Sequence, residues 1–133
     1  MSPLITILAI ESSCDETACA IVQKKAGDDF VTVISETTAT SLSKHIETKG
    51  IVPEVAAREQ LKSILPVIEQ TLQKASLGIS DIEAIAVTTG PGLIGSLLVG
   101  VETAKTLAMA WNKPIIPVNH VMAHPYANFI REI

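Results

Sequence analysis

The sequence predicts a single α/β domain built on a mixed five-stranded sheet with flanking helices. Nearly half of the 133 residues are apolar, yet only four are aromatic: two phenylalanines, one tryptophan and one tyrosine. The core must therefore consist of Ile, Leu, Val and Ala. Such cores are typical of buried parallel strands. In addition, strand-like and helix-like patterns alternate in the second half of the chain, and the length suits one ordinary domain.

Three strands are predicted at the start of the chain. Residues 4–10 form a continuous apolar run of strand length, and residues 17–23 and 31–38 are rich in β-branched side chains. Turn-forming residues lie between these segments, so consecutive strands can pair directly. We expect the three strands to form a meander.

A helix is predicted over residues 53–75. Pro53 suits a first helical turn, Pro66 is expected to kink the helix, and Gly78 is a plausible stop. The apolar residues recur at the spacing of one helix face. They are Leu61, Ile64, Leu65, Ile68, Leu72 and Ala75.

The second half alternates between strand and helix. A strand over residues 82–87 leads into a glycine-rich turn and a helix that ends near Trp111; a short strand follows at 114–118. Asn119 is placed to cap a last helical segment that begins at His120. By analogy, the order of three strands, helix, strand, helix, strand and helix fits one lobe of the ribonuclease-H-like fold of actin-like (ASKHA) ATPases. Such proteins normally hold a nucleotide between two lobes.

Charge and composition limit the partners and the compartment. The net charge of −4 gives no basic footprint for a phosphate backbone, so any RNA binding must be local or shared. Cys14 and Cys19 are expected to be reduced, and each is expected to be a buried, inert thiol. No basic residue precedes the first apolar run, which argues against a signal peptide and for a cytoplasmic protein. The uncharged stretch 84–101 is interrupted by a Gly-Pro-Gly turn, which argues against a membrane span.

Two histidines four residues apart, His120 and His124, are the clearest candidates for chemistry. On a helix both imidazoles project from one face and can share a metal ion. Two unrelated surface histidines are the alternative. The zinc-protease pattern needs Glu directly after the first histidine, and Val121 stands there instead, which argues against a metallopeptidase.

Two further segments leave their alternatives open. Residues 88–95 form a glycine-rich turn between a strand and a helix, suited either to an anion or to tight packing, and they lack the Lys of a P-loop. Residues 12–17 join the first two strands and carry Asp15 and Glu16. These carboxylates either work near a metal or phosphate or are simply solvated in a turn.

Taken together, four segments resemble the TsaD family in order and spacing. They are Ile-Glu-Ser-Ser-Cys-Asp-Glu-Thr at 10–17, the segment 50–58, Thr-Gly-Pro-Gly-Leu-Ile-Gly-Ser-Leu-Leu-Val-Gly at 89–100, and 117–124. The family consists of tRNA threonylcarbamoyladenosine transferases, once labelled glycoproteases or O-sialoglycoprotein endopeptidases. The resemblance implies that residues 1–133 are the N-terminal lobe of such an enzyme, without its C-terminal lobe.

The resemblance also implies roles for four residues. His120 and His124 hold a divalent metal, iron or zinc, together with an aspartate of the C-terminal lobe. The metal orients the threonylcarbamoyl group of threonylcarbamoyl-AMP while the amine of the adenosine next to the tRNA anticodon attacks it. Asp15 and Glu16 are the catalytic candidates, placed to position the incoming amine or a metal-bound water. The isolated lobe is expected to be inactive in transfer.

The implied partners are tRNA and threonylcarbamoyl-AMP, with TsaB-like and TsaE-like proteins in bacteria or KEOPS subunits in archaea and eukaryotes. A homodimer formed through the lobe is also expected, whereas binding to a membrane is not. The alternative function is a non-catalytic, TsaB-like assembly or dimerisation module. The histidine pair favours the catalytic subunit, since TsaB-like proteins lack it.

Four positions depart from the family pattern. Lys49 replaces a usual glycine, Met122 and Ala123 replace a frequent Glu-Gly between the histidines, and Pro125 follows the second histidine. A proline disfavours helical geometry in the residue before it. We therefore expect Pro125 to tilt the imidazole of His124 away from its partner and to lower metal affinity.

Overall fold

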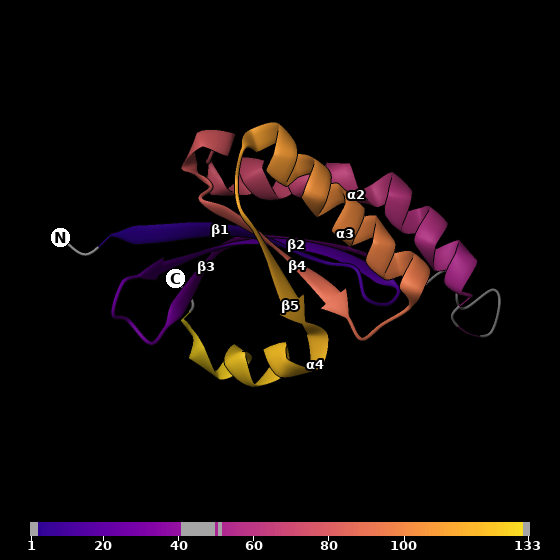
Figure 1. Cartoon of the computed structure of the whole chain (residues 1–133). Helices are drawn as coiled ribbons and strands as arrows, with labels where there is room; N and C mark the ends of the chain where they lie inside the picture. Colours follow the sequence, from indigo (N-terminus) through magenta and orange to yellow (C-terminus); the bar gives the residue numbers. More distant parts are fainter. Residues whose placement is uncertain (1–2, 41–49, 51, 132–133) are drawn as a thin grey trace.

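The structure is a computed structural model that describes residues 3–40, 50 and 52–131 (Figure 1). Its centre is a six-stranded sheet in the order β5-β4-β1-β2-β3-β6. Helices α2 and α3 cover one face of the sheet, and the short helix α4 lies on the other side (Figure 1). Lys49, one of the departures from the family pattern, lies outside the described residues.

The predicted meander is confirmed. Strands β1 (Leu4–Glu11), β2 (Glu16–Lys25) and β3 (Val31–Thr40) pair antiparallel in chain order. Each strand includes the segment predicted for it and extends slightly beyond it. The extension of β1 matters for the site, because it places Glu11 as the last residue of the strand.

The two strands predicted in the second half of the chain are also present. Strand β4 (Ala84–Gly90) pairs parallel with β1, and β5 (Ile115–Asn119) pairs parallel with β4. The sheet nevertheless has six strands and not five, because β6 (Ile130–Arg131) adds to the far edge, parallel to β3. Two residues are too few to produce a strand pattern in a sequence.

Helix α2 spans Pro53–Ala75, as predicted, and continues through Pro66. It ends because Ser76 adopts a left-handed conformation, so Gly78 is not the stop; Gly78 precedes the 3-10 turn η1 (Ile79–Asp81). The face that meets the sheet is narrower than the predicted apolar face. Leu61 and Leu65 are largely exposed, at 65% and 61%, so their assignment to the packed face was wrong. The buried residues are Ala56, Gln60, Ile64, Val67, Ile68 and Thr71.

Helix α3 (Ile94–Trp111) packs closely on the sheet through small residues one turn apart, Ser96, Gly100 and Ala104. The core between sheet and helices is aliphatic, as the composition predicts. Its buried members include Leu8, Ile10, Ile21, Ile64, Val67, Ile68, Ile82, Ile85, Val87 and Val99. No helix in the described part of the chain is long and apolar enough to cross a membrane.

Candidate metal site at the carboxyl ends of the parallel strands

The residues singled out from the sequence meet at one edge of the sheet. Glu11 ends β1, Gly90 ends β4 and Asn119 ends β5. Because these strands run parallel, their carboxyl ends point the same way, which is where open α/β sheets bind ligands. Three segments leave the sheet there: the acidic loop (residues 12–15), the glycine-rich turn and α4.

Helix α4 (His120–Ala123) begins directly at the end of β5. Asn119 caps it as predicted, because its side-chain oxygen accepts a hydrogen bond from the Met122 N–H at 3.0 Å. The 3-10 helix η2 (His124–Phe129) follows without a break, and Pro125 stands in its first turn. A proline fits there because its missing N–H would have no helical partner at that position.

Pro125 does not separate the two imidazoles, which corrects the sequence expectation. His124 keeps right-handed helical dihedrals, with φ −55° and ψ −46°. Its Nε2 lies 3.3 Å from the Nε2 of His120, and the two rings meet edge to face at 87°. The prediction that the two histidines share one face is therefore confirmed.

The spacing of the two nitrogens suits a metal ion. Two imidazole nitrogens that bind one tetrahedral Zn²⁺ at about 2.0–2.1 Å stand about 3.3–3.4 Å apart. The 3.3 Å between the Nε2 atoms of His120 and His124 matches this distance. Within residues 3–40, 50 and 52–131, however, no group of three His, Cys, Asp or Glu side chains is placed to hold a metal. The pair therefore fits as part of a ligand set and not as a complete one.

Glu11 holds the first imidazole from behind. Its Oε2 lies 3.0 Å from the Nδ1 of His120 and accepts a hydrogen bond from the Thr88 hydroxyl at 2.8 Å. Its Oε1 accepts a hydrogen bond from the Ser13 N–H at 2.6 Å. Burial alone raises the pKa of the Glu11 carboxyl, but the hydrogen bonds from His120, Ser13 and Thr88 outweigh it and leave the pKa below its ordinary value.

The acidic loop lies against the histidine pair. The Ser13 hydroxyl is 3.2 Å from the Nδ1 of His120, which brings the loop between β1 and β2 into contact with α4. Asp15 thus stands in the loop that touches His120 through Ser13, and Glu16 follows directly as the first residue of β2. Asp15 is half-buried and Glu16 is exposed. Cys14 is exposed as well, so the expectation of a buried thiol was wrong for Cys14, whereas Cys19 is buried as expected.

A buried glutamine fixes the backbone of this loop. Gln60 of α2 is 1% exposed, and its Nε2 faces the carbonyl oxygens of Ser12, Cys14 and Glu16 at 3.3, 3.0 and 3.0 Å. One side chain therefore satisfies several loop carbonyls that would otherwise need water. The conformation of the acidic loop is set by the helix packed beneath it.

The glycine-rich turn packs onto the same loop. The Leu93 N–H donates to the Ser13 carbonyl oxygen at 2.8 Å. A Cβ added to Gly92 would overlap that carbonyl group, so only glycine allows the approach. Tight packing thus explains Gly92.

A recess lies beside the site on the sheet face that α2 and α3 leave uncovered. It has a volume of about 410 Å³. Glu11 and Thr88 stand at its polar side, Ala123 and Ile130 bound it from the C-terminal segment, and alanines of the strands supply much of its floor. The site therefore opens onto a largely apolar hollow.

Sequence reasoning missed Glu11 and Gln60. The only signal for Glu11 was its place at the carboxyl end of a predicted strand, next to the loop that carries Asp15. The signal for Gln60 was weaker: it is a polar residue on the buried side of an amphipathic helix. The Glu11 contact with His120 spans 109 residues of sequence, so no local pattern could contain it.

Structural comparison supports the fold. YeaZ from Pseudomonas aeruginosa superposes with a TM-score of 0.65 at 18% identity over 92% of this chain and 50% of that protein. RuvC of T. thermophilus, solved with a Holliday junction substrate, gives a TM-score of 0.51 at 9% identity over 91% of this chain and 68% of that protein. At these identities the likeness concerns the fold alone, and it agrees with the predicted ribonuclease-H-like, ASKHA-type lobe.

Sequence comparison is more specific. A sequence model of the TsaD family, described as tRNA N6-adenosine threonylcarbamoyltransferase, matches residues 32–133. Relatives of that name match this chain at 51% identity in Thermomicrobium roseum, 48% in Staphylococcus aureus strain Newman and 44% in Anaeromyxobacter dehalogenans. The matches cover 93%, 99% and 96% of this chain in the same order, but 33%, 37% and 36% of the relatives. The chain thus spans about a third of the length of these relatives. Because the family's sequence model matches more than half of the chain, the chain belongs to the TsaD family.

Proposed function

We propose that this chain provides the N-terminal lobe, and with it the histidine half of the metal site, of a tRNA N6-adenosine threonylcarbamoyltransferase. The reaction moves threonylcarbamoyl from threonylcarbamoyl-AMP to the adenosine next to the tRNA anticodon, with AMP as the leaving group. The observation that carries the proposal is the pair of Nε2 atoms 3.3 Å apart at the carboxyl ends of the parallel strands.

The proposed metal is a divalent iron or zinc ion held by His120 and His124. A third protein ligand, an aspartate in the resemblance, comes from outside the 133 residues. When bound, such a metal supplies a Lewis acid that binds and polarises the carbonyl oxygen of the acyl group. A lobe with two ligands only is expected to bind metal weakly and to transfer nothing by itself.

The chain's own residues then position the nucleophile. In this proposal the carboxylate of Asp15 or Glu16 accepts a proton from the incoming adenosine amine as it attacks the acyl carbon. The support is positional: Asp15 stands in the acidic loop and Glu16 follows it as the first residue of β2. Ser13 joins this loop to His120 at 3.2 Å, and Gln60 holds it from beneath. The recess of about 410 Å³ beside Glu11 offers space for part of the acyl donor.

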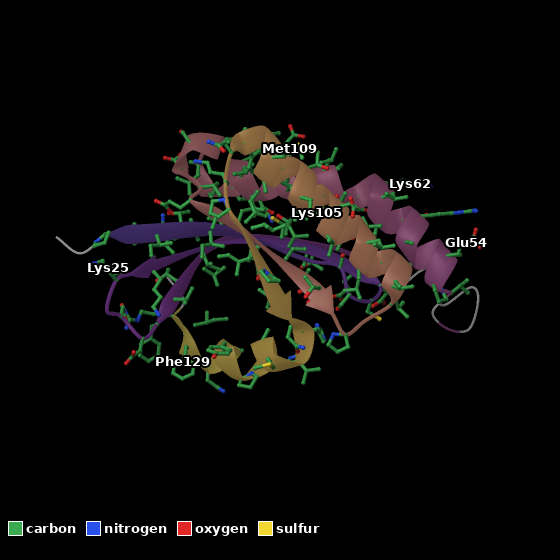
Figure 2. The ribbon with its side chains drawn as sticks, in the orientation of Figure 1. Lys25, Glu54, Lys62, Lys105, Met109 and Phe129 are labelled. Atoms are coloured by element: carbon green, nitrogen blue, oxygen red, sulfur yellow. The ribbon has the colours of Figure 1, made fainter. Side chains whose placement is uncertain are left out.

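A chimera tests the transfer activity. The segment of the Staphylococcus aureus relative that matches this chain is replaced by residues 1–133, and transfer of labelled threonylcarbamoyl to tRNA is measured. We expect the chimera to transfer, and His120→Ala and the double variant Asp15→Asn/Glu16→Gln to lose at least about a hundredfold. Lys62→Ala, on the outer side of α2 (Figure 2), should be unchanged. A chimera that folds and binds tRNA but is as active with His120→Ala as without it contradicts the proposal.

Metal titration of the 133-residue chain tests the site separately. Zn²⁺ binding is expected to depend on both histidines, so His120→Ala and His124→Ala should each abolish it. Pro125→Leu should leave it nearly unchanged, since Pro125 does not part the imidazoles. Equal zinc binding by the wild type and both alanine variants would remove the metal from the proposal.

A second candidate function is an assembly module that pairs with another lobe of the same fold. The helical layer carries exposed apolar side chains on α2 and α3, and each helix includes a pair of them one turn apart. They are Leu61 and Leu65 on α2, and Ile94 and Leu98 on α3. Figure 2 shows Lys62 and Lys105 on the same helical layer.

Sedimentation equilibrium distinguishes this candidate. A dimer that dissociates in the Leu61→Glu or Leu98→Glu variant, with unchanged zinc binding, favours assembly through the helical layer. A monomer at all concentrations argues against self-pairing. The other proposed partners are tRNA and TsaB-like and TsaE-like proteins in bacteria, or KEOPS subunits in archaea and eukaryotes; the proposed compartment is the cytoplasm.

A further inference from the structure

The contact between Glu11 and His120 dictates where the imidazole keeps its proton. A carboxylate can only accept hydrogen bonds, and Oε2 of Glu11 lies 3.0 Å from Nδ1 of His120. Nδ1 must therefore carry the proton. The Ser13 hydroxyl, 3.2 Å from the same nitrogen, can accept from it as well, so it does not oppose this arrangement.

We propose that Glu11 is a positioning residue of the metal site: it fixes His120 as the Nδ1–H tautomer and so presents a bare Nε2 lone pair toward His124. The inference rests on the proposed metal site and deepens it. Metal-binding histidines commonly donate their second N–H to a carboxylate, which sets the ring orientation and makes the ligand more basic. Here that carboxylate comes from the last residue of the central strand.

The two histidines are consequently unequal. A bare Nε2 on His120 can only accept across the 3.3 Å contact, so a hydrogen bond there needs the proton of His124 on its Nε2. Glu11 thus presents the Nε2 of His120 to a metal, whereas His124 in that tautomer would first have to move its proton from Nε2. Glu11 itself is held on both oxygens, by Ser13 and by Thr88, so it cannot easily turn away.

Because of this arrangement, the Glu11→Gln variant tests the position of the His120 proton directly. The Ser13 N–H faces Oε1 at 2.6 Å and needs an acceptor there, so it selects the amide oxygen of the glutamine for that position. The amide NH₂ then takes the place of Oε2 and donates to Nδ1 of His120. The Thr88 hydroxyl adapts by accepting a hydrogen bond. The substitution should therefore move the proton of His120 from Nδ1 to Nε2.

The experiment is ¹⁵N NMR of the metal-free chain labelled at histidine, at a pH of about 8.5, well above the ordinary imidazole pKa of about 6.5. Long-range proton–nitrogen spectra separate the protonated nitrogen of each ring from the bare one. We expect Nδ1–H for His120 in the wild type and Nε2–H in Glu11→Gln. Thr88→Val, which removes a partner of Glu11 but leaves the His120 contact, should keep the wild-type tautomer. A wild-type His120 with its proton on Nε2 overturns the inference, even if no variant folds.

Zinc affinity provides the second readout. Loss of an outer-shell partner typically lowers metal affinity 10–100-fold, and we expect a loss of about that size for Glu11→Gln. If the wild type shows the expected tautomer but binds no zinc, the proposed metal site fails while the positioning by Glu11 stands as a property of the fold. If zinc binds and Glu11→Gln changes neither tautomer nor affinity, the inference fails and the metal site stands.

Discussion

Gly100 allows helix α3 to lie against Ser12, the first residue of the acidic loop. Replacing Gly100 should therefore disturb both the packing of the helix and the conformation of the loop. The Ser12 hydroxyl donates to the Ser96 carbonyl oxygen at 2.7 Å and accepts from the Gly100 N–H at 3.1 Å. A Cβ added at residue 100 would overlap the Ser12 Oγ and stand 3.3 Å from the Ser12 Cβ. Ser12 is fully buried, so its side chain has no free space into which it can turn.

The expected cost of Gly100→Ala follows from these contacts. Two buried hydrogen bonds of about 1 kcal/mol each are lost, and forcing a methyl group into a packed site costs about 1–3 kcal/mol. Replacing glycine by alanine inside a helix returns about 1 kcal/mol. The net loss is about 2–4 kcal/mol in the free energy of unfolding.

A double-mutant cycle makes the reasoning testable. In a Ser12→Ala background the overlapping oxygen is gone, so Gly100→Ala should be neutral or stabilising by up to about 1 kcal/mol. Urea unfolding followed by circular dichroism measures all four proteins, and with a slope of about 2 kcal/mol per molar, Gly100→Ala alone should lower the midpoint by about 1–2 M. If the two substitutions are additive, Ser12 and Gly100 do not interact as described and the argument is refuted.

Three further predictions concern residues with different burial. Ile64→Ala should cost about 2–5 kcal/mol and Leu65→Ala, its exposed neighbour, less than about 0.5 kcal/mol in the same urea assay; similar costs would contradict the assigned helix face. Gln60→Leu should cost about 3 kcal/mol, because three carbonyls lose their shared partner; a neutral Gln60→Leu would show that water replaces it. Burial raises the pKa of Cys19 from 9.0 to about 12, so the folded protein keeps a proton that the unfolded chain releases above pH 9. Stability should therefore fall by about 1.4 kcal/mol more between pH 8 and pH 10 in the wild type than in Cys19→Ala, and an equal fall in both would contradict the burial of that thiol.

The local patterns of the sequence predicted most of the fold. The span of α2, the meander and the cap by Asn119 follow from periodicity and turn chemistry within a few residues. The failures were of two kinds. Leu61 and Leu65 have helical periodicity but lie outside the face that the sheet can reach, and β6 consists of two residues that gain strand geometry only beside Val31.

The candidate site was predictable in part for a related reason. Two histidines one helical turn apart are visible in a sequence, and so is a loop with two carboxylates. The partners that orient them are not, because they come from remote elements: Glu11 from the central strand and Gln60 from a helix on the opposite face. Their identity depends on strand order, which local patterns leave open.

The junction between α4 and η2 bears on which metal ions the site accepts. His120 directly follows a strand and is held at Nδ1, whereas His124 begins a stretch through residue 131 in which every residue is exposed. A site with one anchored and one adjustable ligand adapts its span to ions of different radius. If the pair holds a metal as proposed, it selects poorly by size, and affinity should follow the general order for divalent metals, in which Cu²⁺ exceeds Zn²⁺. The ion bound in a cell would then reflect which metal is available as much as the shape of this lobe.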